Sequence, residues 1–350
     1  MRALAHPGVL ATLLAAALFG AGTPLAKLLL AQTSPWLLAA LLYLGSGVGL
    51  FGLRVLRKAP LVELPPGQGK WLAGAVLAGG MAGPVLLMVG LSGMPASSAS
   101  LLLNAEGVLT ALIAWCVFRE NFDRRIALGM LAIVAGGIVL SWPGDANFGE
   151  LWPALAVLGA CLAWAVDNNL TRKVSLSDAS FIAMVKGLAA GASNLVLALA
   201  LGAAWPGAPV VVAAAVLGFA SYGASLVLFV IGLRHLGTAR TGAYFSVAPF
   251  VGAALAIALL DEPISLPLVI AGALMAWGVW LHLTENHQHE HTHEPLEHSH
   301  AHEHGVGDPH HDHPHEDELA PGTRHVHSHV HTTIAHSHAH YPDAHHRHSH

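Results

Sequence analysis

Charged residues are scarce in this sequence. Asp, Glu, Lys and Arg make up 11% of its 350 residues, while 54% of the residues are hydrophobic. A soluble globular domain carries about 25% charged residues, so this composition excludes a water-soluble globular protein. The scarcity of charge indicates that most of the chain lies in a membrane.

Cysteine is scarcer still, since Cys116 and Cys161 are the two cysteines of the chain. Both lie in apolar runs, and neither has a second cysteine or a histidine at the spacing of a metal site. The sequence therefore excludes a disulfide framework. We expect both thiols to be buried among packed side chains.

The few charges divide the chain into a body and a tail. Residues 1–284 hold 14 Lys and Arg against 10 Asp and Glu, whereas residues 285–350 hold 2 against 11. Of the 26 histidines, 23 lie in residues 285–350. We therefore expect a membrane-embedded body followed by a disordered, histidine-rich tail, because so polar a segment has little apolar surface to bury.

The body contains ten apolar runs that are long enough to cross a bilayer, for which a helix needs about 20 residues. Charges and clusters of Pro and Gly separate them. The sequence predicts an all-α membrane protein with ten transmembrane helices. They are expected at residues 8–30, 35–56, 70–91, 95–118, 125–142, 151–170, 179–202, 209–233, 238–260 and 264–284.

Basic residues are confined to alternate loops of this ten-helix arrangement. Twelve Lys and Arg lie before the first span or follow an even-numbered one, while loops 31–34, 92–94, 143–150, 203–208 and 261–263 contain none. Loops rich in Lys and Arg stay on the cytoplasmic side of a membrane. We therefore expect a multi-pass protein of the cell (inner) membrane with both termini in the cytoplasm.

The body also repeats itself. Glu120 begins a segment that leads into the Gly-rich last span of the first half, and Glu262 does the same in the second half, 142 residues later. The repeats are residues 1–142 and 143–284, with five spans each, and the tail is 285–350. Because five is odd, the second repeat enters the membrane inverted, an architecture that usually encloses a central site.

Two segments occupy matching places in the repeats. They are Phe19-Gly-Ala-Gly-Thr-Pro-Leu-Ala-Lys27 in the first span and Ala163-Trp-Ala-Val-Asp-Asn-Asn-Leu-Thr-Arg172 in the sixth. Together with the ten spans and the hinges at Glu120 and Glu262, they resemble the EamA-like transporters of the drug/metabolite transporter superfamily. The resemblance covers nearly all of residues 8–284 and implies a transporter fold. It does not select a substrate, because relatives handle amino acids, sugars, nucleotides and drugs.

Glu106 stands near the middle of the fourth span, where a charged side chain is costly and needs a reason. We favour a proton or substrate site. The alternative is a carboxyl group that fixes neighbouring helices through hydrogen bonds. Asn104, two residues away, is expected on another face of the helix as a packing residue.

Lys27 ends the motif of the first span. It either attracts an anionic group, neutralises Glu106, or extends to the outer headgroups. Asp167 and Asn168 lie in the cytoplasmic third of the sixth span, and Lys186 lies at a similar depth in the seventh. We favour an internal ion pair between Asp167 and Lys186, with a gating or substrate role as the alternative.

Two tyrosines are further candidates for the substrate pathway. Tyr222 lies in the eighth span and Tyr244 in the ninth. Single aromatic residues inside a helix more often pack in a core, so this alternative stays open for both.

The tail alternates histidine with other residues in three stretches. Sites rich in imidazole suit Zn, Ni, Co and Cu, so we expect the tail to bind such ions in vitro. A passive tail is the alternative. The candidate ligands are His287, His289, His291, His293, His298, His300, His302, His304, His325, His327, His329 and His331.

Three classes of function compete. A secondary transporter of small organic metabolites such as amino acids or drugs, working by alternating access, is favoured, with export preferred over import. The alternative is a Ni, Co or Zn transporter, or a metal-regulated carrier that uses the tail. An enzyme is disfavoured, because the spans hold no paired catalytic carboxylates, histidine pair or Ser–His arrangement.

The expected partners follow from this choice. They are a small-molecule substrate, the lipid bilayer and divalent ions at the tail, with a homodimer left open. We expect no required cofactor and no nucleic-acid partner, and Zn, Ni or Co are the ions expected at the tail.

Overall fold

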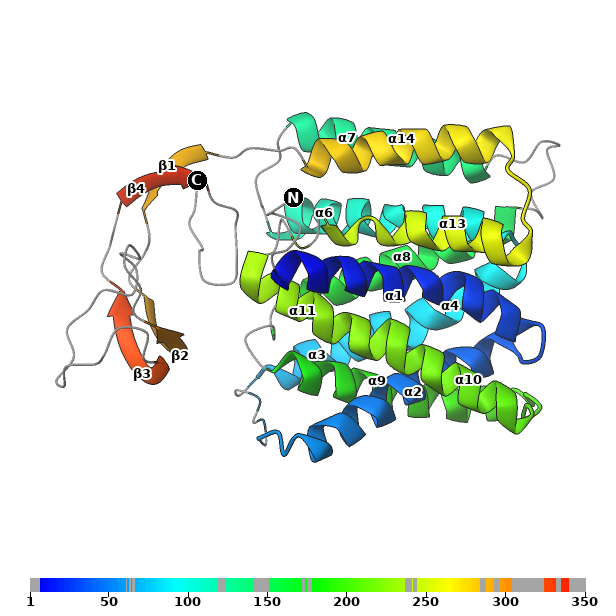
Figure 1. The fold of residues 1–350 in the computed structure, drawn as a ribbon, viewed down its shortest axis with the longest axis horizontal. Helices are drawn as coiled ribbons and strands as arrows, with labels where there is room; N and C mark the ends of the chain where they lie inside the picture. Colours follow the sequence, from blue (N-terminus) through cyan, green and yellow to red (C-terminus); the bar gives the residue numbers. More distant parts are fainter. Residues whose placement is uncertain are drawn as a thin grey trace. The chain divides into compact units, whose positions relative to one another are not determined.

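The computed structural model describes residues 7–60, 62, 64, 67–118, 124–141, 151–171, 174, 178–236, 241, 244–283, 288–292, 296–303, 324–331 and 335–339. The chain forms two compact units, Met1–Glu285 and Asn286–His350. The described part of the first unit is helical and has no β-strand (Figure 1).

The helices follow one another along the first unit with short connections. They are α1 (Pro7–Leu30), α2 (Pro35–Leu56), α3 (Gly69–Ala75), the π-helix η2 (Val76–Ala82), α4 (Gly83–Ser92), α5 (Ala96–Leu102), α6 (Asn104–Phe118), α7 (Arg124–Ser141), α8 (Trp152–Thr171), α9 (Ala179–Ala200), α10 (Ala208–Gly218), the π-helix η5 (Phe219–Ala224), α11 (Ser225–Leu236), α13 (Ala248–Leu260) and α14 (Leu266–Leu283).

Seven helical segments are long and apolar enough to cross a membrane. They are Pro7–Leu30, Pro35–Leu56, Gly69–Ser92, Ala96–Val117, Trp152–Thr171, Ala179–Ala200 and Ala208–Gly232. Three shorter apolar helices are Ala127–Ser141, Ala248–Leu260 and Leu266–Leu281. Each of the ten predicted runs contains one of these segments or nearly coincides with it. The all-helical, multi-pass fold is therefore confirmed, and the count of ten crossings stays a prediction.

Short polar residues begin several of these helices. Ser34 precedes Pro35 at the start of α2, and its Oγ accepts a hydrogen bond from the Leu37 N–H. The Asp178 carboxylate does the same for the Phe181 N–H at the start of α9. Such caps satisfy backbone donors that have no partner inside the helix, so these boundaries could be predicted from the sequence.

The fourth span is interrupted, although the sequence predicts one helix over residues 95–118. The chain turns at Leu103, between α5 and α6. The Asn104 side chain lies at this turn and donates a hydrogen bond to the Leu101 carbonyl at 3.0 Å. This bond competes with the helical ladder and gives the interruption a physical cause.

The interruptions occur at matching places of the two repeats that the sequence predicts. The break at Leu103 corresponds to a turn at Ser246 and Val247, before α13. The π-helix η2 in the third span likewise corresponds to η5 in the eighth. Such π-helical turns are rare and occur frequently at functional sites.

Helices of one half pack against helices of the other. α1 packs against η5, α11 and α13, while its counterpart α8 packs against η2, α4 and α6. α2 packs along its own counterpart α9, and α7 along α14, as Figure 1 shows for the latter pair. These contacts between the halves therefore occur in pairs in which the roles of the halves are exchanged.

Glycines allow the close approach of α2 to α9. A Cβ atom at Gly47 would lie 2.5 Å from the backbone nitrogen of Leu188, and one at Gly187 would lie 2.6 Å from the nitrogen of Gly47. Side chains at these positions would therefore force the helices apart. The small-residue runs of the sequence predict such contacts between helices.

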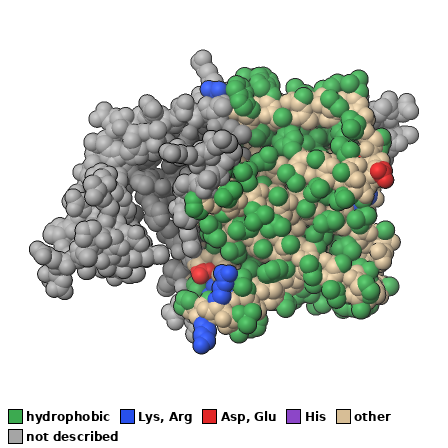
Figure 2. All heavy atoms as spheres, in the orientation of Figure 1, with side chains coloured by type: hydrophobic (Ala, Val, Ile, Leu, Met, Phe, Trp, Pro, Cys, Tyr) green, Lys and Arg blue, Asp and Glu red, His purple; other side chains and the backbone are tan. Residues whose placement is uncertain are grey.

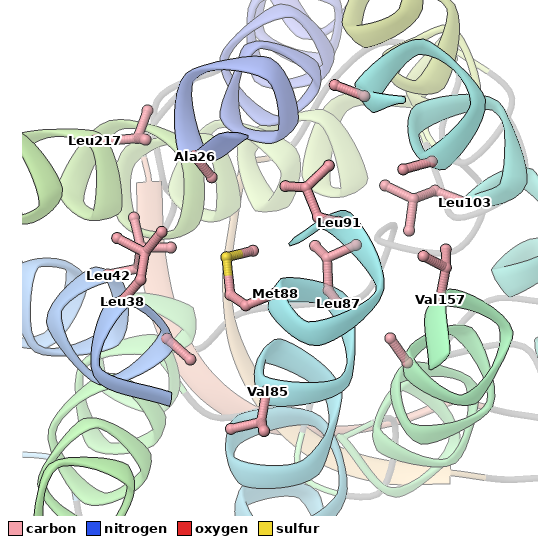
Figure 3. Packing of buried hydrophobic residues seen from close by; sticks show 14 of the residues in the cluster. Ala26, Leu38, Leu42, Val85, Leu87, Met88, Leu91, Leu103, Val157 and Leu217 are labelled. Atoms are coloured by element: carbon pink, nitrogen blue, oxygen red, sulfur yellow. The ribbon is translucent and has the colours of Figure 1, made fainter. Parts of the chain in front are cut away.

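The interior is filled by aliphatic side chains. Figure 3 shows Leu38 and Leu42 of α2 facing Met88 of α4, and all three side chains are fully buried. Around the outside, large apolar residues are exposed, such as Val196 at 69%. Figure 2 shows apolar side chains over most of the described face, as expected for a surface in contact with lipid.

The two cysteines differ in their surroundings. Cys161 is buried, and its Sγ lies 3.7 Å from the Leu102 carbonyl oxygen. Cys116 is exposed, next to the exposed Trp115 and Val117 in the last turn of α6. The prediction that both are buried is wrong for Cys116, because an apolar run does not reveal which side of a membrane helix faces lipid.

The second unit contains four described strands. They are β1 (Gln288–Thr292), β2 (Leu296–Glu303), β3 (Arg324–His331) and β4 (Ala335–Ala339). β1 pairs with β4 and β2 with β3, and both pairs are antiparallel. Along the chain, the β2–β3 pair therefore lies between the two strands of the β1–β4 pair. The sequence predicts a disordered segment here, so this expectation differs from the structure. The strands pair through backbone hydrogen bonds, which do not require an apolar surface.

A substitution of Gly47 tests the approach of α2 to α9. We expect Gly47→Ala to cost about 1–3 kcal/mol of stability, because the added methyl group meets the α9 backbone. Gly52→Ala in the same helix is the matched control, since a Cβ there meets nothing within 4 Å. Thermal unfolding in detergent would be measured for both. Equal midpoints for the two variants would contradict the close packing.

Candidate functional site

Glu106 occupies the first turn of α6, directly after the break in the fourth span. It is half-buried, and its Oε1 accepts a hydrogen bond of 2.8 Å from the Asn168 side chain of α8. Asn168 also lies 3.4 Å from the Thr110 hydroxyl, and its side chain is exposed. Exposed polar groups within an apolar helix indicate that water reaches this place.

Asp167 and Lys186 form the ion pair that the sequence predicts. The Lys186 Nζ lies 2.6 Å from both carboxylate oxygens, and the Thr171 hydroxyl donates to the carboxylate at 2.8 Å. The side chains of Asp167 and Lys186 are 7% and 14% exposed. The pair joins α8 to α9, and each charge is satisfied inside the protein.

These residues form one polar cluster on facing helices. Asn169 adds to it by donating to the backbone oxygens of Thr110 and Ala165, at 3.3 and 2.9 Å. The members of the polar cluster are Glu106, Thr110, Asp167, Asn168, Asn169, Thr171 and Lys186.

Aromatic rings from several helices form a second cluster. The Phe19 ring of α1 lies 6.4 Å from Trp164, 5.9 Å from Tyr222 and 5.5 Å from Phe245, measured between ring centroids. The Tyr43 ring lies 5.4 Å from Tyr222. The aromatic cluster consists of Phe19, Tyr43, Trp164, Tyr222, Phe245 and Phe229, whose ring lies 4.9 Å from Phe245.

The backbone of η2 connects the two clusters. The Gly79 carbonyl accepts hydrogen bonds from the Tyr43 hydroxyl and the Trp164 indole N–H, both at 2.9 Å. A Cβ at Gly79 would collide with the Asp167 carboxylate. On α8, moreover, Trp164 and Asn168 are one turn apart and share a face. The polar and aromatic clusters are therefore neighbours in one site.

Lys27 lies elsewhere. Its Nζ donates to the Leu91 and Met94 carbonyls at 2.5 and 3.0 Å, at the end of α4. Glu262 acts on the other side of this turn, where its carboxylate accepts from the backbone N–H groups of Ala96 and Ser97 at 2.6 and 2.8 Å. Both contacts place a charge where it complements a helix end. In this structure Lys27 does not pair with Glu106.

The remaining predicted residues also have defined places. Tyr244 is half-buried and takes no part in the ring contacts of the described residues. Asn104 is buried and also approaches the Met275 sulfur of α14 at 3.9 Å, as expected of a packing residue. Glu120 lies outside the described residues.

Sequence reasoning missed part of this site. Thr110 lies one turn after Glu106, and this spacing was an available signal. The roles of Phe19 and Tyr43 had no such signal, because their neighbours come from distant parts of the chain. Gly79 could not be distinguished from the other glycines of its run.

The tail histidines are only partly described. His287, His293 and His304 lie outside the described residues, while the other nine candidates lie in β1, β2 and β3. Among the residues that the structure describes, no three His, Cys, Asp or Glu side chains form a group that could hold a metal ion.

An ion pair between the end of α2 and the start of α9 offers a comparison with the buried one. Arg54 lies 3.0 Å from the Asp178 carboxylate, whose side chain is 37% exposed. Partial burial opposes the charge of Asp178. Hydrogen bonds from Ser180 and the Phe181 N–H, together with Arg54, outweigh it and lower the pKa of the carboxyl group. The pair therefore persists at neutral pH, and its contribution is lost as the pH falls through this lowered pKa.

Known proteins resemble this chain. Residues 6–142 match the EamA-like transporter family. A protein of Methanothermobacter thermautotrophicus, named an uncharacterized transporter, is 28% identical over 298 residues, which cover 78% of this chain and 85% of that protein. A solved structure, described as the crystal structure of a protein, matches with a TM-score of 0.60 and 22% identity over 77% of this chain and 94% of the other. This last likeness concerns the fold alone, which is that of a multi-pass helical membrane protein.

Removing one member of the buried pair should be more harmful than removing both. We expect Asp167→Asn or Lys186→Met alone to cost about 3–5 kcal/mol, because each leaves a buried charge without a partner. The double variant should recover part of this loss. Thermal unfolding in detergent measures all three.

Asp178→Asn is the control for these variants, because it removes the charge of a partly exposed carboxylate, keeps a capping residue, and leaves Arg54 its hydrogen bonds to Ser180 and the Pro60 carbonyl. It should cost at most about 1 kcal/mol. Additive losses in the double variant would show that Asp167 and Lys186 do not stabilise each other.

Proposed function

We propose that this protein is a secondary transporter of small organic molecules, related over its whole body to the EamA-like family and working by alternating access. The match of residues 6–142 and the transporter name of the archaeal relative support this proposal. Contacts between the halves occur in pairs in which the roles of the two halves are exchanged. Such pairing allows a second conformation, in which each half takes the arrangement that the other half has here. No enzymatic activity is proposed.

The observation that carries the proposal is the place of Glu106. It lies at a break in a membrane helix, half-buried, beside an exposed asparagine. Transporters of the inverted-repeat type bind substrates near such interrupted helices. We propose Glu106 and Asn168 as the substrate or proton site, lined by Tyr222, with the Asp167–Lys186 pair as its structural support.

The orientation of the protein belongs to the same proposal. The confinement of Lys and Arg to alternate loops supports an inner-membrane protein with both termini in the cytoplasm. The polar cluster then lies nearer the cytoplasmic side, and the turn held by Lys27 and Glu262 lies at the outer side. Export is the proposed direction.

Glu106→Gln tests the role of the carboxylate. The variant keeps the size and the hydrogen bond to Asn168 but cannot exchange a proton. We expect it to fold and to lose at least about 90% of pH-gradient-driven transport in vesicles, a loss equivalent to about 1.4 kcal/mol or more.

The transported solutes would be screened from mixed amino acids and organic cations, and Asp178→Asn, at the start of α9 and outside the site, serves as the control. Full gradient-driven transport by Glu106→Gln would reduce Glu106 to a structural residue.

A second candidate function is the binding of transition-metal ions by the tail. The ladder register favours it, since His298, His300 and His302 are paired with His329, His327 and His325. In the β1–β4 pair, His289 and His291 are paired with His338 and His336. The pairing sets histidine positions of two strands opposite one another, and sites rich in imidazole suit Zn, Ni and Co ions.

Truncation after Thr284 tests this candidate. Full-length protein should bind Zn or Ni ions at micromolar concentrations at pH 7.5 and release them near pH 5, as imidazoles become protonated. The truncated protein should remain folded and lose this binding. Metal bound per chain would be measured by equilibrium dialysis. Equal binding by both forms would contradict a metal site in the tail and show that the site lies in residues 1–284.

A further inference from the structure

The charged groups inside the spans are few enough to examine one by one. Six charged residues lie in the candidate spans and shorter apolar helices. Arg54 and Lys70 lie within two residues of a helix end, which leaves four deeper inside. These four are Lys27, Glu106, Asp167 and Lys186.

Three of the four are neutralised or capped by the protein itself. Asp167 and Lys186 satisfy each other at 2.6 Å. Lys27 is held by the backbone carbonyls of Leu91 and Met94. Charges of this kind offer little to a ligand, because a ligand would first have to displace an existing partner.

Glu106 is the exception. Within the described part of the chain it has no ion-pair partner, and its hydrogen bond comes from the neutral amide of Asn168. The N-terminus of α6 supplies about half a positive charge at most. A deprotonated Glu106 therefore leaves this site with a net negative charge, whose natural complement is a cation.

The surroundings restrict the kind of cation. Asn168, which holds Glu106, shares a face of α8 with Trp164, and Trp164 packs against Phe19 of the aromatic cluster. Tyr222 is half-buried and lies between Phe19 and Tyr43. Aromatic faces attract organic cations and also cover their apolar parts. A hydrated metal ion would gain nothing from these rings.

We infer that the site recognises an organic cation with an aromatic or apolar portion, such as an aromatic amine. The ammonium group lies at Glu106 and the apolar portion lies against the aromatic cluster. This inference rests on the proposed transport function and names the substrate class of the same site. A proton held by Glu106 without a ligand is the competing occupant.

Binding to purified protein in detergent tests the substrate class with three probes of similar size. Radiolabelled 2-phenylethylammonium is measured by equilibrium dialysis, with 2-phenylethanol and phenylacetate as neutral and anionic competitors. We expect the cation to bind at least tenfold more tightly than either competitor. Glu106→Gln should weaken cation binding at least tenfold, and Glu106→Asp should retain part of it.

Two further variants divide the site. Tyr222→Leu should weaken 2-phenylethylammonium binding about three- to thirtyfold through the loss of an aromatic face. Asp178→Asn, at the start of α9 and outside the site, should leave it unchanged. Equal binding of the three probes, or wild-type affinity in Glu106→Gln, would overturn the inference, and the first result would leave the proton as the occupant of Glu106.

Transport of the same probes separates this inference from the proposed function. Proteoliposomes that bind the cation but move no solute of any charge would refute the transporter and keep the binding site. Proteoliposomes that move neutral or anionic solutes but not the cation would refute the substrate class and keep the transporter.

Discussion

The structure depends on one constraint, the absence of water around most of its surface. Inside a bilayer, a polar group without a partner costs several kcal/mol, so each charge must find its partner within the protein. Asp167 meets this requirement through Lys186 and Thr171. Lys27 meets it with the carbonyl groups at the end of α4. These contacts tie helices together at both ends of the body. The lack of water therefore limits the number of charges and also confines them to positions where another helix offers a partner.

The constraint also decides where the helices can be irregular. A π-helix or a break leaves backbone carbonyls without their usual donors, and inside a membrane other groups must supply them. At η2, Tyr43 and Trp164 both donate to Gly79. At η5 the π-helix supplies the donor, since its Ser221 hydroxyl donates a hydrogen bond to the Leu18 carbonyl of α1. Irregular backbone is therefore concentrated where the halves meet and side chains from the other half are available.

Much of the fold could be predicted from the sequence because hydropathy and helix caps are local properties. The helix boundaries at Ser34 and Asp178 and the Asp167–Lys186 pair follow from position along the chain and depth in the membrane. The break at Leu103 depends on a single side-chain bond that hydropathy cannot detect. The aromatic cluster requires α1, α8 and η5 to meet, and the exposure of Cys116 requires knowledge of the lipid-facing side. Such properties arise from the assembled helices and leave no local pattern.

Glu106 of α6 and Asp167 of α8, carboxylates on two helices that pack together, thus differ in how they are paired. Asp167 is saturated by an amine and a hydroxyl, so it stabilises the contact of α8 with α9 and has little left for a ligand. Among the described residues Glu106 has no charged partner, and it is half-buried beside the exposed Asn168. A counter-ion placed permanently beside Glu106 would stabilise the fold, but it would also compete with any cation that binds there. An alternating-access protein needs a ligand bound weakly enough to leave, so a carboxylate held by one neutral amide suits that task better than one held by an amine.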